Sequence, residues 1–375
     1  MNPIRSLLQK CGQFQSKWIL SYNMHMRQRG ISHRHLAAHS PKAAPSASTT
    51  TTSTQSRPYQ VVFNRDVKKI QRNRAACRVE RSRKVDYLKD EVAKRLVERL
   101  LDIKRRFPLT LDVGAGPGYL IRYLDKDMTE RVVQVDSAER MLIRDKAVEY
   151  DVPTERAVMD EEHLEFPPNT FDCVLSSLSL HWINNLPHVF KQIHDCLKPD
   201  CPFIGAMVGG DTLYELRTAL QLAESEREGG ISPHVSPMTD VRDVGSLLGG
   251  AGFGLVTVDM DEIQVCYPSM YELMRDLRDM GESNAVAARK PYLRRATMQR
   301  AAEIYKDVYG DPDGITATFN IIYLIGWKPD PDNPIRVKER GSAAASFKDL
   351  DSILDTAGAE ADHDSPACVF ATPKK

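Results

Sequence analysis

The sequence predicts an α/β fold with a mostly parallel, seven-stranded sheet, and three observations carry this prediction. Strand-like apolar runs alternate with helix-like segments between about residues 107 and 210, as expected for a parallel sheet covered by helices. The first of these runs ends in a glycine-rich turn, within the stretch LDVGAGPGYL, Leu111–Leu120. Acidic residues then follow the next two strands, where the carboxyl ends of a parallel sheet meet.

A helical lead is expected before the first strand. Charged, helix-favouring sequence runs from Val67 to Arg105, and Leu88, Val92, Leu96 and Leu100 repeat at four-residue steps, which indicates one apolar face. The alternating region then reads, in chain order, LTLDVG, a helix at Pro117–Leu124, VVQVD, a helix at Ala138–Tyr150, FDCVLSSLSL, a helix at Leu186–Leu197, and PFIGAMVG.

After Gly210 the alternation stops. The pattern predicts a helix at Thr212–Glu228, a loop GGISPHVSPMT, a helix at Asp240–Leu248 that ends at Gly249–Gly250, a strand LVTVDMDEIQVCY, a helical segment at Ser269–Val308 and a late strand FNIIYLIGW. The predicted division of the chain is a leader at 1–57, one domain at 58–328 and a loose tail at 329–375. A lid insertion is expected at about 211–240 and a helical insertion at about 269–309.

The N-terminal stretch has the composition of a mitochondrial transit peptide. From Met1 to Arg65 the sequence contains no Asp or Glu, while basic residues recur and a Ser/Thr/Ala run follows. Cleavage is expected between Gly30 and Arg57. A disordered basic tail is the alternative interpretation.

The overall composition excludes several classes of partner. Lys plus Arg and Asp plus Glu number 51 each, so the charge balance favours neither nucleic acid nor an anionic membrane surface. No run approaches the roughly 18 to 20 apolar residues of a membrane helix, so a transmembrane segment is not expected. The seven cysteines lack C-x-x-C spacing, which predicts a reduced compartment and no zinc or other metal site.

The spacing of the glycine loop excludes two common nucleotide sites. A dinucleotide fingerprint needs a third glycine where Tyr119 stands, and no Gly-Lys-Ser/Thr follows for a triphosphate loop. The pattern Asp112-x-Gly114-x-Gly116-x-Gly118 instead resembles motif I of the class I S-adenosylmethionine-dependent methyltransferases. The loop is therefore expected to hold that cofactor.

Downstream residues fit the same interpretation. Asp136 ends the second strand and is placed to accept hydrogen bonds from ribose hydroxyls. Asp160 and Glu161 follow the third strand, where this superfamily contacts adenine, and Ser177 lies at the cofactor-facing end of the fourth. Each signal is weak alone, since the loop can be a packing turn and Asp136 a helix cap. All of them in order predict an S-adenosylmethionine site.

Longer strings carry a narrower resemblance, from about Val62 to Leu350. They are SSLSLHWINNLP, IGAMVGGDTLYELRTALQLAESEREGGISPHVSP, TVDMDEIQVCYP, LMRDLRDMGESNA and IIYLIGWKP. Together they resemble the mitochondrial complex I assembly factor 5 family, arginine hydroxylases related to bacterial malonyl-carrier-protein methyltransferases. Ala115 and Pro117 stand where relatives often have Cys and Arg.

The resemblance implies a matrix protein, peripheral to the inner membrane, that hydroxylates an arginine of an iron–sulfur subunit of NADH:ubiquinone oxidoreductase early in assembly. Other assembly factors are implied as partners. Two alternatives stay open: methyl transfer from S-adenosylmethionine to a protein or small acid, and a chaperone role without catalysis.

The residues by themselves do not predict hydroxylation, because the sequence contains no H-x-D or H-x-E motif of the kind that supplies two histidines and a carboxylate to an iron site. A guanidinium substrate calls for carboxylates and aromatic faces. The candidate catalytic residues are Asp211, Glu215 and Glu226, with His181 and Trp182 lining the pocket. A solvated acidic helix face and a core tryptophan are the structural alternative.

Overall fold

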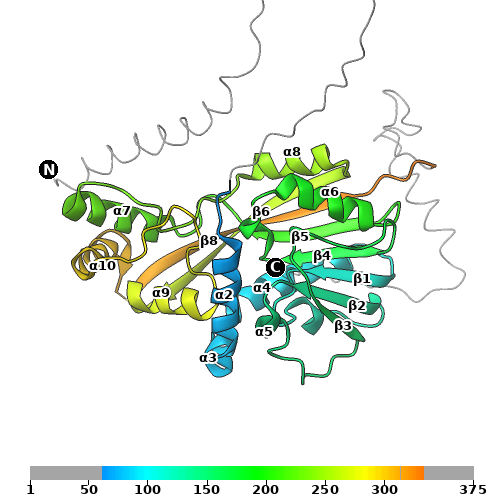
Figure 1. Ribbon diagram of the computed structural model, residues 1–375, viewed down its shortest axis with the longest axis horizontal. Coiled ribbons are helices and arrows are strands. Elements are labelled where there is room, and N and C mark those ends of the chain that lie inside the picture. Colours follow the sequence, from blue (N-terminus) through cyan, green and yellow to red (C-terminus); the bar gives the residue numbers. More distant parts are fainter. Residues whose placement is uncertain (1–60, 313, 333–375) are drawn as a thin grey trace, which may run out of the picture. The chain divides into compact units, whose positions relative to one another are not determined.

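The computed structural model describes residues 61–312 and 314–332, and all of these residues belong to one compact unit that extends from Pro58. The predicted leader at 1–57 and nearly all of the predicted tail lie outside the described residues. The central element is a sheet in the order β3-β2-β1-β4-β5-β8-β6, shown in Figure 1. A two-residue strand, β7, pairs with β8 outside this path, so the sheet has eight strands rather than the seven expected.

Five strands form the parallel part of the sheet. They are β1 (Phe107–Val113), β2 (Thr129–Asp136), β3 (Thr154–Val158), β4 (Cys173–Ser177) and β5 (Pro202–Val208). The remaining strands, β6 (Gly254–Tyr267), β7 (Gly310–Asp311) and β8 (Gly314–Trp327), are antiparallel to their neighbours. The mostly parallel α/β fold predicted from the sequence is confirmed.

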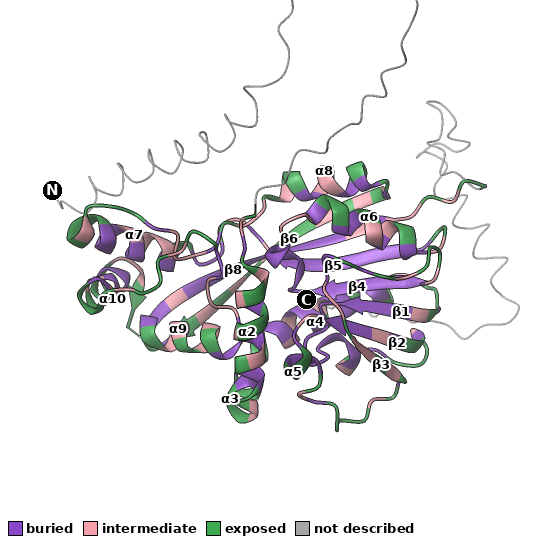
Figure 2. Ribbon diagram, viewed as in Figure 1, coloured by how far each residue is buried: buried purple, intermediate pink, exposed green. Residues whose placement is uncertain are grey.

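Helices cover both faces of the sheet. In β4, Val174 packs into a core with α6 (Leu186–Cys196) and α8 (Val241–Ala251). Its neighbours Cys173 and Leu175 are buried on the opposite side, as strand alternation requires. There α4 (Tyr87–Leu101) contacts β4 and β5, and Figure 2 shows these two strands as buried.

The lead consists of α2 (Arg65–Ala76), α3 (Val79–Lys84) and α4, as the sequence predicts. The Asn64 side chain caps α2 by accepting from the Val67 amide at 3.0 Å, which satisfies one free donor at the helix start. In Figure 1, α2 lies between the parallel strands and a group of helices around the far half of β6 and β8. That group comprises α7 (Tyr214–Glu228), α9 (Met270–Asp279) and α10 (Arg295–Tyr309).

Two predicted helices are wrong. In place of Pro117–Leu124 there is one 3-10 turn, η1 (Leu120–Arg122), because Gly118 has a φ of +95° that no right-handed helix contains. In place of Ala138–Tyr150 there is only α5 (Glu139–Leu142). The chain leaves α5 in turns, where the fully buried Arg144 side chain bonds to Asp86 and Asp145, and these contacts override local helix propensity.

Two other boundaries differ from the prediction. The helix expected to end at Gly249–Gly250 continues to Ala251 and is capped by Gly252 at a φ of +102°. The expected helical segment at 269–308 breaks between α9 and α10, with Gly281 at a φ of +79° just after α9. The connecting residues 280–294 supply much of the wall of a cavity described below.

Candidate functional site

The glycine loop follows β1 at the carboxyl end of the parallel strands. Gly114, Gly116 and Gly118 have φ values of +71°, +56° and +95°, in the left-handed region that glycine tolerates best. A Cβ at Gly114 would lie 2.1 Å from Ser179 Oγ, and one at Gly118 would lie 3.0 Å from Gln134 Nε2. The backbone conformation and the close neighbours therefore both require these glycines.

Asp136 ties the loop to the end of β2. One carboxylate oxygen accepts from the Gly116 amide at 3.0 Å, and the other accepts from the Ala138 amide at 2.7 Å. Burial raises the pKa of Asp136, and the nearby Arg72 guanidinium opposes this rise. The carboxylate thus holds the loop in shape, with Arg72 as its counter-charge.

Two arginines of the lead helix α2 lie close to Asp136 and to a second buried acid, Glu161. Arg72 Nη1 lies 3.5 Å from both Asp136 Oδ2 and Glu161 Oε1. Arg65 Nη2 bonds to Asp160 Oδ1 at 2.5 Å and also contacts the Glu161 carboxylate. Asp136 and Glu161 are both completely buried, so the two arginines neutralise charges that water does not reach.

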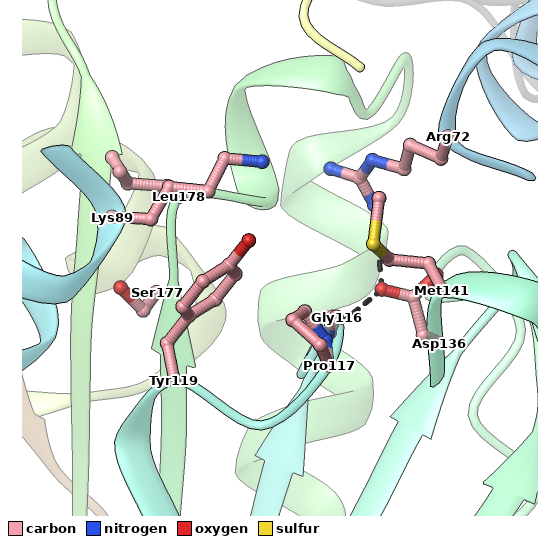
Figure 3. Close-up of a pocket in the computed structure, with 10 residues that line it drawn as sticks. Arg72, Lys89, Gly116, Pro117, Tyr119, Asp136, Met141, Ser177 and Leu178 are labelled. Carbon is pink, nitrogen blue, oxygen red and sulfur yellow. Dashed lines mark hydrogen bonds and ion pairs between the residues drawn. The ribbon is translucent and has the colours of Figure 1, made fainter. Parts of the chain in front are cut away.

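The space over the loop, called the crevice from here on, is polar and nearly filled. Its free volume is about 10 Å³. Figure 3 shows Arg72 and Lys89 pointing into it above the Gly116–Pro117 turn. The buried Ser177 Oγ at its edge has no hydrogen-bond partner. The crevice is lined by Arg72, Lys89, Gly114, Gly116, Pro117, Tyr119, Asp136, Met141, Ser177 and Leu178.

The residues expected to bind a cofactor fall into two groups. Gly114, Gly116, Asp136 and Ser177 line the crevice. The others lie around it: Gly118 in the loop, Asp160 and Glu161 under the α2 arginines, and Asp112 beneath the loop. Their roles as cofactor contacts stay predictions.

Asp112 is completely buried, and its Oδ1 atom has no hydrogen-bond partner. Burial raises its pKa to about 7, opposed by a hydrogen bond from Gln134. It does not line the crevice in this structure.

A second cavity, of about 310 Å³, adjoins the crevice, and Lys89 and Leu178 line both spaces. Most of its wall is apolar and comes from α4, α7, α9 and β8 and from the loops after α7 and α9. The apolar residues are Leu88, Leu178, Val208, Leu213, Leu216, Leu220, Val235, Met238, Met274, Leu277, Met280, Pro291, Leu293 and Phe319.

The charged end of this cavity is organised by Glu282, in the segment after α9. Its carboxylate accepts from Trp182 Nε1 at 2.6 Å and from Lys89 Nζ at 2.7 Å. Lys68 Nζ and His181 Nε2 each lie 3.8 Å from Oε2. Burial alone would raise the pKa of Glu282, but the two lysines hold it well below its usual value.

Lys68 is buried against the same cluster. Its amino group donates to the carbonyl oxygens of Gly281 at 3.1 Å and Ser283 at 2.7 Å, and lies 3.4 Å from the centre of the Trp182 ring. Burial lowers the pKa of Lys68 well below its usual value, and Glu282 opposes this. Burial also lowers the pKa of His181, whose Nδ1 has no hydrogen-bond partner.

The five predicted catalytic candidates do not meet in one place. His181 and Trp182, in η2 (Leu180–Trp182) after β4, line the cavity as expected, but Asp211, Glu215 and Glu226 do not. The buried Glu215 carboxylate bonds to Thr318 of β8.

The other two acids, Glu226 of α7 and Asp211 before it, also lie away from the cavity wall. Glu226 pairs with Arg300 of α10 at 2.7 Å, and Asp211 is exposed at the start of the segment. The acidic residues of α7 therefore join it to neighbouring elements, and Glu282 is the acidic side chain in the cavity wall.

Sequence reasoning missed the residues that organise this region: Lys68, Arg72, Lys89 and Glu282. One signal was available, since Gly281 and Pro291 interrupt the expected long helix and mark a loop. The three cations had no such signal, because Lys and Arg on a helix are usually solvent-exposed.

Among residues 61–312 and 314–332, no group of three or more His, Cys, Asp or Glu side chains is arranged to hold a metal ion. Within the same ranges, no helix is both long enough and apolar enough to cross a membrane.

The strand order, the antiparallel last pair of long strands and the glycine loop next to an acidic strand end define a class I methyltransferase-like domain. A sequence profile of the methyltransferase domain family matches residues 111–204, which span the loop and β1 to β5.

Relatives identify the particular family. The rat mitochondrial arginine-hydroxylase NDUFAF5 is 54% identical over 79% of this chain and 85% of its own length. The zebrafish (Danio rerio) protein of the same name is 51% identical over 84% and 97%. The chain therefore belongs to the NDUFAF5 arginine-hydroxylase family, and the resemblance drawn from the sequence is confirmed.

A more distant relative carries a different name. The malonyl-[acyl-carrier protein] O-methyltransferase of Gallionella capsiferriformans is 31% identical over 70% of this chain and 90% of its own length. This chain is thus similar in sequence both to proteins named for hydroxylation and to a protein named for methyl transfer.

Proposed function

We propose that this protein hydroxylates an arginine side chain of an iron–sulfur subunit of NADH:ubiquinone oxidoreductase during early assembly of that complex. The observation that carries the proposal is the 54% identity to an arginine-hydroxylase NDUFAF5 over 79% of the chain. The cavity beside the crevice supports it, because Trp182 and Glu282 supply an aromatic ring and a carboxylate. Those are the two groups that recognise a guanidinium.

The proposed cofactor of the crevice is S-adenosylmethionine. The residues present fit it, since Gly114 and Gly116 of the loop line the crevice and Ser177 Oγ lacks a partner. In this proposal Arg72 and Lys89, which face the loop, supply cations for the cofactor carboxylate, and Asp136 accepts from the ribose. When bound, such a cofactor supplies an electrophilic methyl group and a positively charged sulfonium.

The closed crevice leaves about 10 Å³, far less than the several hundred Å³ typical of ligand pockets. Cofactor entry therefore requires the side chains of α2 that project into the crevice to move. Arg72 is the side chain whose displacement frees the Asp136 carboxylate.

The proposed location is the mitochondrial matrix, peripheral to the inner membrane, as the names of the relatives and the acid-free N-terminus support. In this proposal residues 1–57 are a transit peptide, 58–328 form the methyltransferase-like domain and 329–375 are a tail. The lid insertion at about 211–240 and the helical insertion at about 269–309 would then form the cavity roof. Other assembly factors are the proposed partners.

One observation favours methyl transfer to an acid as a second candidate. Of the cations in the cavity wall, Lys89 pairs with Glu282 and Lys290 pairs with Glu224 and Glu228, whereas Arg289 has no acidic partner among the described residues, and a free cation suits a carboxylate substrate. The bacterial relative named O-methyltransferase agrees with this alternative. A chaperone role, in which the cofactor is structural, is the third.

Mass spectrometry of the iron–sulfur subunit separates the three candidates. Cells that lack this protein are supplied with the wild-type chain or with Asp136→Asn, and tryptic peptides of the subunit are compared. The proposal predicts one added oxygen on an arginine with the wild-type chain. An added methyl group supports the second candidate, and complex assembly without any mass change, in both cell lines, supports the third and overturns the proposal.

A further inference from the structure

The lead helix α2 carries three largely buried cations on one face. Arg65, Lys68 and Arg72 are spaced three and four residues apart, which places them in one row along the helix. Arg72 contacts Asp136 of the crevice, Arg65 contacts Asp160 and Glu161 beside the crevice, and Lys68 contacts Glu282 of the cavity wall. One helix therefore supplies counter-charges to acids at both spaces.

The surroundings of Lys68 are those that a substrate cation requires. Its ammonium lies over the face of Trp182 at 3.4 Å from the ring centre, next to a buried carboxylate and two backbone carbonyls. Aromatic faces attract cations through their ring quadrupole, and arginine stacks on them more readily than lysine does. A guanidinium would satisfy the same groups with more donors and a planar face.

We propose that Trp182 and Glu282 form the subsite for the guanidinium of the substrate arginine, and that Lys68 fills this subsite while α2 is closed. The inference rests on the proposed function and deepens it. It names the binding groups of the substrate, and it makes Lys68 an internal competitor.

The contacts of Glu282 show which cation the substrate replaces. Lys89 Nζ is 2.7 Å from Oε1 and comes from α4, whereas Lys68 Nζ is 3.8 Å from Oε2 and comes from α2. Exchanging Lys68 for a guanidinium keeps the number of positive charges around the carboxylate unchanged. Lys89 can stay in place during the exchange, so a buried carboxylate is never left without a counter-ion.

The unpartnered Nδ1 of His181 is a further polar group for the incoming substrate. The histidine is 7% exposed, lines the cavity and tilts against the Trp182 ring with 5.3 Å between ring centres. Buried polar atoms are nearly always satisfied in folded proteins. A guanidinium N–H on Trp182 is within the reach of such an acceptor, whereas the Lys68 amine leaves it unused.

Closure by one helix predicts coupling between the two ligands. Displacing α2 removes Arg72 from Asp136 of the crevice and Lys68 from Glu282 of the cavity wall together. A ligand that binds only the open arrangement raises the population of that arrangement for the other ligand. Cofactor and substrate are therefore expected to strengthen each other's binding.

The test uses the full chain with 5-fluorotryptophan at its three tryptophans and follows the fluorine spectrum, in which Trp182→Phe identifies the Trp182 signal. The probe is Nα-acetylarginine amide, and the neutral control is Nα-acetylcitrulline amide. The arginine probe is expected to move the Trp182 signal, while the citrulline analogue leaves it in place.

Variants on one helix sharpen the test. Lys68→Met is expected to tighten probe binding about tenfold, because the closed competitor is removed. Lys69→Met, at the exposed neighbouring position, is the matched control and leaves the affinity unchanged. Glu282→Gln is expected to weaken binding by about tenfold or more. Glu282→Asp, which keeps the charge, tests the same point if the glutamine variant does not fold, and is expected to bind more weakly than the wild-type chain.

The proposal is overturned if citrulline moves the Trp182 signal equally, if Lys68→Met binds the probe no more tightly than Lys69→Met, or if folded Glu282 variants bind it unchanged. Cell assays separate this result from the fate of the proposed function. Hydroxylation by both wild type and Glu282→Gln would sink the subsite and leave the function standing. A Trp182 response to arginine without hydroxylation by the wild type would do the reverse.

Discussion

The crevice and the cavity lie side by side and differ in how the chain builds them. The crevice is formed mostly by the glycine loop and the ends of β2 and β4, within about residues 114–178, and Arg72 of α2 and Lys89 of α4 project into it. The cavity takes its wall from residues between Leu88 and Phe319 and its charged end from Glu282, in a loop after α9. The first is a local motif, and the second is a meeting of distant segments.

This difference shows where specificity can change within one fold. Backbone geometry in the crevice admits few substitutions, because positive φ values and tight neighbours constrain the glycines. The cavity depends on side chains from insertions outside the parallel strands. This difference explains how relatives with similar sequences can be named for different reactions, because function depends on the site that a fold carries.

The largest effect should come from the crevice. Gly114→Ala places a Cβ 2.1 Å from Ser179 Oγ at a φ of +71°, so it should lower the free energy of unfolding by about 3 kcal/mol and abolish binding of S-adenosylhomocysteine. Denaturant unfolding and calorimetry measure these effects.

Gly249→Ala is the matched control. A Cβ there meets nothing within 4 Å, and the residue lies in α8, so the change should stabilise the fold by up to about 1 kcal/mol. Equal behaviour of the two variants would contradict the distinction between the constrained loop and an ordinary helix.

Asp112 is buried in β1 just before the glycine loop and does not line the crevice. Its folded pKa is about 7, above the ordinary value of 3.8, so the folded state holds a proton that the unfolded state has lost. The contribution of Asp112 to the free energy of unfolding is therefore fully present at low pH and decreases as the pH rises toward 7. Between about pH 5 and pH 7 the free energy of unfolding of the wild type should fall by roughly 2 kcal/mol. The free energy of unfolding of Asp112→Asn should not show this fall.

Denaturant midpoints across this pH range measure the difference. Parallel profiles for wild type and Asp112→Asn would show that the carboxyl is ionised in the folded protein throughout the range.

A smaller effect distinguishes the two acidic positions of the crevice. Asp136→Asn should weaken S-adenosylhomocysteine binding about tenfold, by loss of a charged acceptor. Asp160→Asn should weaken it less, since the Asp160 side chain is 42% exposed and outside the crevice wall. Calorimetric titration compares them, and a larger loss for Asp160→Asn would reverse our assignment of the two acids.

Much of the fold was predictable because its signals are periodic and local. The apolar steps from Leu88 to Leu100 became buried positions of α4, and the strand-like runs became the parallel sheet. The errors at Pro117–Leu124 and Ala138–Tyr150 arose where Gly118 adopts a left-handed conformation and Arg144 is buried with distant acids. The low helix propensity of Gly118 was a local signal against the first helix, whereas the burial of Arg144 leaves no mark on local propensity.

For the site, the resemblance to motif I pointed to Gly114, Gly116, Asp136 and Ser177, which line the crevice, and the expected guanidinium pocket pointed to His181 and Trp182, which line the cavity. The acids of α7 misled the sequence interpretation, because a charged helix face looks the same whether it meets a ligand or another helix. Arg300 and Thr318, which lie far along the chain, occupy Glu226 and Glu215.

The sequence by itself determined the α/β sheet, the glycine loop and the family, because periodicity, turn chemistry and long distinctive strings are written in consecutive residues. Only the tertiary structure decided that Arg65, Lys68 and Arg72 turn inward and that Lys68 meets Glu282 on Trp182. The physical reason is that the cost of burying a charge is repaid by partners 64 to 214 positions away along the chain. Such partners are adjacent only after the chain has folded.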